Sequence, residues 1–214
     1  MGGGTFDVSI VQIEGKNYEV LATTGDGHLG GDDFDTELVN YCKTEFKAST
    51  GVDIDELNER PKNKALRRLR SECTRAKKVL SVAVHCEINV ECIANEEDLS
   101  VEVTRATFDS LSAKHLDKII PIVEQVLQHA ELTKQEIDDI VLVGGSTRIV
   151  KVQTMLTEFF DNRKLNYRAN QDEAVALGAA ILANNIKSND DKLTFQDRSA
   201  THEEQACQDT ETVR

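Results

Sequence analysis

Apolar and polar residues alternate along the first part of the chain. From Thr5 to Ala22 this alternation predicts a β-hairpin, and the residues at 14–17, Glu-Gly-Lys-Asn, have the composition of its turn. Apolar residues then recur every three or four positions from Phe34 to Phe46. Because acidic residues stand at the start of this stretch, we expect a helix with one buried face.

A second helical stripe, made of Leu, Cys and Ala residues, runs through positions 66–80, with Arg, Lys, Thr and Ser off the stripe. The polar stretch 49–64 before it contains Gly51 and Pro61 and is predicted to be a loop. Helical sequence also fills 105–130, where Pro121 marks a break or a new first turn because proline removes a helix donor.

Between these helical stretches, the pattern predicts a strand pair at 84–93 and 99–103. One parity of the first strand is apolar or weakly polar throughout and includes Cys86 and Cys92. Side chains of one parity share a face of a strand, so both cysteines are expected to face the core.

The apolar run from Asp139 to Val143 has the composition of a strand buried on both faces. It ends at a glycine pair and is followed by a helical stripe from Ile149 to Phe159. Strand, glycine pair and helix in this order form an arrangement that binds anions.

Near the end of the chain, Asn170 to Glu173 resembles a capping box. It precedes a helix of small residues, 174–183, that can pack closely against a sheet. Beyond Ile186 apolar residues become sparse, so the segment 187–214 is predicted to be mostly disordered.

Composition narrows the function classes. The 214 residues carry a net charge of −13, which argues against a general nucleic-acid surface, since such a surface needs clustered Lys and Arg. The five cysteines are odd in number and unevenly spaced, a pattern that favours reduced thiols in the cytosol. No apolar run approaches a membrane span and no leader opens the chain, so we expect a cytoplasmic protein without membrane partners.

Three separated segments combine glycine, hydroxyl and cationic groups suited to a nucleotide. They are Gly2-Gly3-Gly4-Thr5, then Lys77, Lys78 and Ser81, and then Gly144-Gly145-Ser146 with Arg148. Each has an ordinary alternative: a plain turn, solvated lysines on a helix, and close packing of strand on helix. Asp7 could hold Mg²⁺ through water, or be an exposed strand aspartate.

Five segments occur in the order and near-spacing of one family. They are 2–9 (Gly-Gly-Gly-Thr-Phe-Asp-Val-Ser), 28–35, 66–81, 140–149 and 172–176. Together they resemble the seventy-kilodalton heat-shock chaperones over residues 2 to about 185. The resemblance implies the second lobe of an actin-like ATPase domain, an α/β fold of the ribonuclease H-like type with a mixed sheet and packed helices. It also implies a core at 1–29 and 114–186 and a smaller α+β outer subdomain at 30–113.

The resemblance implies that the cofactor is ATP or ADP with Mg²⁺. It assigns the β- and γ-phosphates to the glycine loop, ribose and adenine to the helix around Lys77, and the other wall of the adenosine pocket to the segment around Arg148. The candidate nucleotide-binding residues are Gly2, Gly3, Gly4, Thr5, Gly31, Thr74, Lys77, Lys78, Ser81, Gly144, Gly145, Ser146, Arg148 and Asp172. Asp7 is the candidate metal ligand, and no catalytic residue is assigned.

In that family, ATP binding and hydrolysis control a separate peptide-binding domain. The implied partners are J-domain co-chaperones and nucleotide-exchange factors, many of which grip the outer subdomain. This sequence departs from the family where Met1 precedes Gly2 in place of Asp-Leu. It also has Thr74 for glutamate and Lys78 for arginine, and Val150 and Gln171 for proline.

The first lobe of the family's ATPase domain and its catalytic lysine are not in this sequence, so hydrolysis is expected to need that lobe. Two alternatives stay open. The chain could be an interaction module that binds exchange factors or a parent chaperone without turning over nucleotide. It could also be a fragment of a sugar-kinase-like phosphotransferase, although the residues at 66–81 argue against this.

Overall fold

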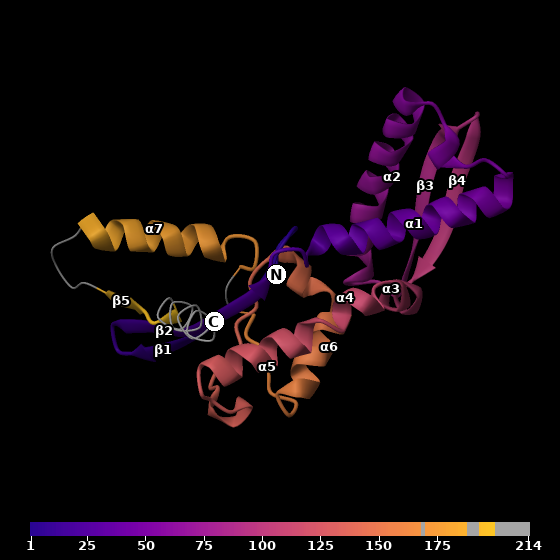
Figure 1. Ribbon diagram of the computed structural model, residues 1–214. Helices are drawn as coiled ribbons and strands as arrows, with labels where there is room; N and C mark the ends of the chain where they lie inside the picture. Colours follow the sequence, from indigo (N-terminus) through magenta and orange to yellow (C-terminus); the bar gives the residue numbers. More distant parts are fainter. Residues whose placement is uncertain (168–169, 188–192, 200–214) are drawn as a thin grey trace, which may run out of the picture.

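The computed structural model describes residues 1–167, 170–187 and 193–199. Its outer end consists of α1, α2, β3 and β4, and its opposite end holds β1, β2, β5 and α7, with α5 and α6 between them (Figure 1). The strands are β1 (Phe6–Glu14), β2 (Asn17–Asp26), β3 (His85–Ala94), β4 (Glu97–Thr104) and β5 (Thr194–Asp197). The α-helices are α1 (Gly31–Thr50), α2 (Glu59–Leu80), α3 (Arg105–Leu111), α4 (Ala113–Leu116), α5 (Ile119–His129), α6 (Val150–Phe159) and α7 (Ala174–Lys187). Single 3-10 turns are η1 (Ile54–Glu56), η2 (Lys134–Glu136) and η3 (Gly145–Arg148).

The predicted hairpin is confirmed as β1 and β2, which pair antiparallel from Phe6 opposite Asp26 to the turn. The sheet order is β1-β2-β5, and β5 runs parallel to β2, so the sheet is mixed as expected. β5 lies within 187–214, so the prediction of disorder is wrong for Thr194–Asp197, where Phe195 stacks on Tyr18. Residues 188–192 and 200–214 of that segment lie outside the described residues.

The two long helices of the outer end are confirmed, and their apolar stripes are buried. The predicted loop at 49–64 is shorter than expected, because α2 already begins at Glu59. Pro61 is the third residue of α2, where a backbone N–H has no partner within the helix, so proline costs no hydrogen bond there. Gly51 ends α1 in the left-handed conformation, with φ at +74°.

The prediction that both strand cysteines face the core is correct for Cys86 and wrong for Cys92, which is exposed. A β-bulge between Val90 and Ala94 shifts the register of β3, and Cys92 itself has a φ of +43°. In the interior, Cys42 and Cys73 are fully buried free thiols. A hydrogen bond with Cys42, together with burial, raises the pKa of Cys73, so the Cys73 thiol is a poor nucleophile.

The helical sequence after β4 is divided at Ser112 and Lys118 into α3, α4 and α5. Pro121 stands in the first turn of α5, so of the two predicted outcomes, a break or a new first turn, the structure has the new first turn. The buried face of α5 packs on β1, β2 and α6. Within the described ranges, no helix combines the length and apolar composition needed to cross a bilayer.

Two predictions, about the segments 139–143 and 174–183, differ from the structure. The segment 139–143 forms only an isolated bridge, from Val141 to Asn166, and Val141 is half exposed, so it is not a strand buried on both faces. The small-residue helix exists as α7, but its apolar side chains at Val175, Leu177 and Ile181 are exposed and do not pack on the sheet. The first difference has a physical reason: β1 lies at the edge of its sheet, and no described strand bridges it to 139–143.

Replacing Glu37 by glutamine is expected to lower the free energy of unfolding at neutral pH by roughly 1 kcal/mol. Glu37 on α1 contacts Lys114 at 2.9 Å and His115 at 3.1 Å. Burial raises the pKa of Glu37, but these two hydrogen bonds together outweigh it, so the pKa lies below its ordinary value of 4.5. The stabilisation is therefore present above that value and lost as the pH falls through the folded-state pKa.

Urea unfolding of both proteins at neutral pH and in acid, below that pKa, measures this effect. The difference between wild type and Glu37→Gln should shrink in acid. A difference that stays constant across this range would contradict the assignment of the effect to the carboxylate.

Candidate functional site

The glycine loop lies on the first turn of α1. The N–H of Gly31 donates to Gly2 O at 2.9 Å, and the N–H of Asp32 donates to Gly3 O at 2.8 Å. In a trans peptide the C=O and the following N–H point in opposite directions. Because these two carbonyls point at α1, the N–H groups of Gly3 and Gly4 point away from it, and neither donates to any described part of the chain.

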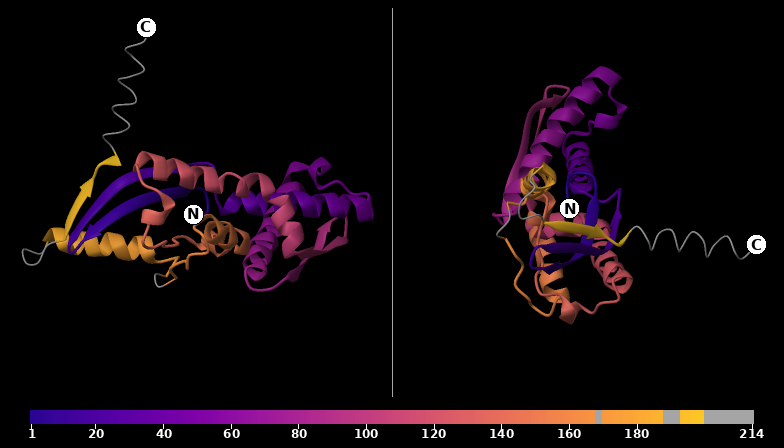
Figure 2. Two further views of the ribbon diagram at one scale, coloured as in Figure 1. Left: turned by 90° about the horizontal axis from the view of Figure 1, so that it is seen from below. Right: turned by 90° about the vertical axis from the view of Figure 1, so that its left-hand side faces the viewer.

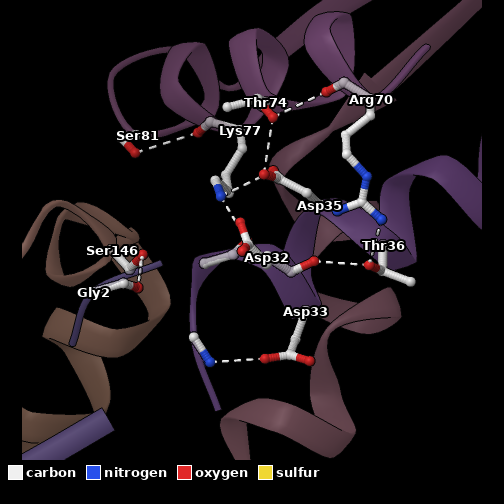
Figure 3. Close-up of polar contacts among 12 residues, drawn as sticks. Gly2, Asp32, Asp33, Asp35, Thr36, Arg70, Thr74, Lys77, Ser81 and Ser146 are labelled. Carbon is white, nitrogen blue, oxygen red and sulfur yellow. Dashed lines mark hydrogen bonds and ion pairs between the residues drawn. The ribbon is translucent and has the colours of Figure 1, made fainter. Parts of the chain in front are cut away.

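Gly30 makes this close contact between loop and helix possible. A Cβ at Gly30 would lie 2.3 Å from Gly3 O and 2.6 Å from Gly3 C. The carboxylate of Asp33 accepts a hydrogen bond from the N–H of Gly30 at 2.7 Å and so closes the first turn of α1 (Figure 3).

A buried ion pair joins α1 to α2. Lys77 Nζ lies 2.9 Å from Asp35 Oδ1 and donates to Gly31 O at 2.6 Å, as Figure 3 shows. The hydroxyl of Thr74 lies 2.9 Å from Asp35 Oδ2. The side chains of Asp35 and Lys77 are only 4% and 12% exposed, so water screens this pair weakly.

The segment that follows 139–143 completes the arrangement. Ser146 Oγ donates to Gly2 O at 2.8 Å, and the Met1 amino group donates to Val143 O at 2.8 Å. Burial lowers the pKa of this amino group, and the charge of Asp7 opposes that shift. Gly144 has a φ of +91°, a conformation that favours glycine. These bonds hold η3 against the glycine loop.

At the outer side of η3, Arg148 forms a two-pronged pair with Asp172. The Nη1–Oδ1 and Nη2–Oδ2 distances are 3.0 and 2.8 Å. The hydrogen bond from Arg148 lowers the pKa of Asp172, and the charge of Lys78 on α2 lowers it further. A Cβ at Gly31 would lie 2.5 Å from Ser146 Oγ and 3.0 Å from Lys77 Nζ, so α2 and η3 meet at the first residue of α1.

The remaining predicted residues lie farther from this centre. Thr5 Oγ1 donates to Asp7 Oδ2 at 2.8 Å at the start of β1, and Asp7 is exposed. Within the described ranges, no three His, Cys, Asp or Glu residues form a group that could hold a metal ion. Ser81 Oγ lies 3.4 Å from Lys77 O, in the last turn of α2.

Asp35 is a site residue that sequence reasoning missed, because the pattern presents it only as an acidic residue of a first turn. The spacing of Asp35 from the apolar residues of the same helix could have identified it. Asp35 stands three positions before Leu38 and seven before Cys42, both buried, which places its carboxylate on the buried face of α1. A charge on such a face needs a partner, and Lys77 is that partner.

Comparisons with known proteins agree with this architecture. The profile of the family described as Hsp70 protein matches residues 1–201. The chain is 48% identical over 181 residues to a ribosome-associated molecular chaperone of Saccharomyces cerevisiae, a match that covers 85% of this chain and 29% of that protein. It is 47% identical over 183 residues to "Heat shock cognate 70 kDa protein 3" of Dictyostelium discoideum, covering 86% of this chain and 28% of that protein.

The chain thus spans less than a third of the length of these relatives. Its mixed sheet and packed helices fit the actin-like ATPase fold expected from the resemblance. The comparisons give no support to the sugar-kinase alternative. The chain belongs to the Hsp70 family of chaperones.

Proposed function

We propose that this chain is the nucleotide-binding second lobe of an Hsp70-type ATPase domain and binds ATP or ADP. The observation that carries the proposal is the orientation of the glycine loop. Its carbonyls at Gly2 and Gly3 are bonded to α1, so the N–H groups of Gly3 and Gly4 face outward and can converge on phosphate oxygens. A Cβ at Gly4 would have no described atom within 4 Å, so space remains for a ligand there.

The adenosine moiety would lie between the end of α2 and η3. Two contacts to Asp172 fix the orientation of the Arg148 guanidinium, and a base can stack on its plane. Lys77 Nζ donates to Gly31 O and pairs with the charge of Asp35, and because an ammonium group has three N–H donors it can also donate to a ribose hydroxyl. Lys78 and Ser81 supply polar groups on the same helix end.

The other candidate residues fall into two roles. Gly31, Thr74, Gly144 and Gly145 position the loop, α2 and η3, because each lies in a close contact within the cluster. Thr5 and Asp7 are the residues nearest the loop that could hold water around a Mg²⁺ ion. The ion would neutralise phosphate charge, and Asp7 would bind it through water because no group of three acidic ligands lies within the described ranges.

Hydrolysis of ATP requires more catalytic groups than this lobe supplies. Phosphoryl transfer needs charge stabilisation and a positioned nucleophile around the whole γ-phosphate. The described residues present donors from one side only, so we propose that hydrolysis depends on a first lobe. Three points stay predictions from the family. They are the core at 1–29 and 114–186, the outer subdomain at 30–113, and the contact of exchange factors and J-domain proteins with this lobe.

Isothermal titration with Mg-ATP and Mg-ADP tests nucleotide binding. Arg148→Ala is expected to weaken binding about tenfold, equivalent to roughly 1.4 kcal/mol. Arg67→Ala is the matched control, since Arg67 is an exposed arginine of α2 away from the cluster, and its removal changes the net charge equally. The control should bind nucleotide like wild type.

Two results would contradict the proposal. One is the absence of heat with either nucleotide, and the other is equal weakening by both variants. If a pull-down then captured an exchange factor, the interaction-module alternative would be favoured.

A further inference from the structure

Basic residues are concentrated on one helix of this acidic chain. Of the 25 lysine and arginine residues, α2 carries nine, and of the 38 acidic residues it carries only two. The net charge of −13 for the whole chain does not describe α2, which is strongly positive. A charge averaged over the chain therefore gives no reason to exclude an anion-binding surface on this helix.

Two sides of α2 use their cations within the molecule. On the side toward α1, Lys77 and Arg70 contact side chains of that helix, as Figure 3 shows. On the side toward β3, Arg68 and Arg75 donate to backbone carbonyl oxygens of that strand at 2.7 and 3.0 Å. These four cations therefore hold α2 against its neighbours.

The outer face of α2 carries cations of a different kind. The inner face is marked by five buried residues, Ala65, Leu69, Cys73, Ala76 and Leu80. At about 100° per residue, four exposed cations lie within about 40° of the opposite direction. We call them the basic ridge: Arg60, Lys64, Arg67 and Lys78. None of their side chains forms a hydrogen bond or an ion pair with the residues that the structure describes.

The ridge is long enough to follow an extended anion. From Arg60 to Lys78 the helix rises about 27 Å, at about 1.5 Å per residue. α2 lies at the end of the molecule opposite to β1, β2 and α7, both in Figure 1 and in the left view of Figure 2. Since the Debye length is about 10 Å at 0.1 M salt, distant acidic residues are largely screened from the ridge. Its arginines can hold phosphate oxygens with two parallel hydrogen bonds.

The composition of α2 selects among polyanions. In α2, which the structure describes completely, no large apolar side chain is exposed and no residue is aromatic. A protein interface has an apolar core, and single-stranded nucleic acids stack their bases on aromatic rings. A nucleic-acid duplex needs neither, because its outer surface is a continuous phosphate backbone.

The packing of α2 favours RNA over DNA. Recognition helices read DNA by entering its major groove. α2 packs on α1 and on β3 (Figure 1), so these neighbours hinder its entry into such a groove. Duplex RNA has a wide, shallow minor groove and is recognised mainly through its shape and its phosphates. A helix on the surface of a domain can contact these phosphates without entering a groove.

We propose that the basic ridge of α2 binds the phosphate backbone of duplex RNA without regard to base sequence. Arg60, Lys64 and Arg67 take no part in the proposed nucleotide site, and only Lys78 belongs to both. The inference therefore goes beyond nucleotide binding and does not rest on it.

The test measures the fluorescence anisotropy of a fluorescein-labelled RNA duplex, titrated with the full chain in the absence of nucleotide. A duplex of about 20 base pairs at about 50 mM salt should bind saturably, with a dissociation constant on the order of 1–100 μM. Four phosphate contacts predict a slope of roughly −3 to −4 when the logarithm of the binding constant is plotted against that of the salt concentration.

A pair of double variants locates the binding surface. Lys64→Ala with Arg67→Ala should weaken RNA binding at least about tenfold and make the slope less negative by about 2. Lys151→Ala with Lys164→Ala is the matched control, because both lysines are exposed, lie in and just after α6, and remove the same charge. The control should stay within about twofold of wild type. Circular dichroism checks that both variants fold.

Titration of Mg-ADP into the ridge variant separates this inference from the proposed nucleotide site. Its affinity for Mg-ADP should equal that of wild type, whatever that affinity is. A loss of RNA binding with unchanged nucleotide affinity therefore supports the ridge alone.

Four outcomes would overturn the proposal. Absence of saturable binding is the first, and equal weakening by the two double variants, which would mean attraction by net charge only, is the second. Equal or tighter binding of duplex DNA or of the single strand would contradict the choice of duplex RNA. Displacement of the RNA by polyglutamate as effectively as by unlabelled duplex would make an acidic protein segment the partner.

Discussion

Replacing Asp35 by alanine is expected to lower the free energy of unfolding by about 3–5 kcal/mol, because it leaves the ammonium group of Lys77 buried without its partner. The two side chains are 4% and 12% exposed, and their charged atoms lie 2.9 Å apart. The hydroxyl of Thr74 loses an acceptor in the same change. Urea unfolding followed by circular dichroism measures the loss.

The double variant Asp35→Ala with Lys77→Met separates the ion pair from simple packing. Removing both charges removes the uncompensated one, so the double variant should be more stable than Asp35→Ala alone. Asp32→Ala is the control, since Asp32 is an exposed acidic residue in the same first turn, and its loss should cost less than about 1 kcal/mol. Equal losses for Asp32→Ala and Asp35→Ala would show that the buried pair contributes nothing.

Gly30→Ala is expected to displace the glycine loop from α1. The new methyl group would lie 2.3 Å from Gly3 O, 2.6 Å from Gly3 C and 2.7 Å from Gly4 C, all backbone atoms that cannot rotate away. Overpacking of this kind costs about 1–3 kcal/mol. The two hydrogen bonds from α1 to the loop would add roughly 1 kcal/mol each if they broke.

Urea unfolding and nucleotide titration measure the two consequences of this change. The variant should be less stable and should also lose nucleotide affinity, because the N–H groups of Gly3 and Gly4 would turn with their peptide planes. Gly27→Ala is the control, since a Cβ at Gly27 meets no atom within 4 Å. A Gly30→Ala protein with wild-type stability would mean that the loop does not rest on α1 as described.

The periodic parts of the fold were predictable from sequence because each pattern reports a local preference that tertiary packing reinforces. The hairpin and the stripes of α1 and α2 belong to this class. Cys92 was not predictable, because a single bulge in β3 reverses the parity on which the prediction rests. The segment 139–143 was not predictable either, since a strand needs a neighbour and its composition cannot supply one.

The sequence predicts a set of candidate site residues, which stays a prediction, but it does not predict the contacts among them. Glycine, hydroxyl and basic residues indicated the loop, the end of α2 and η3. The sequence could not tell that the ammonium group of Lys77 forms a buried ion pair with Asp35, whereas Lys78, the next residue, is exposed. One residue along a helix changes the direction of a side chain by about 100°, so adjacent lysines differ in environment.

The pairing of Arg148 with Asp172 has a consequence for the entropy of binding. A free arginine side chain has roughly 2 kcal/mol of rotamer entropy, part of which is lost when a ligand orders it. Here two parallel contacts to one carboxylate already restrict the guanidinium before any ligand arrives. A molecule that stacks on its plane therefore meets an ordered surface, and the loss of motion on binding is smaller than for an unpaired arginine.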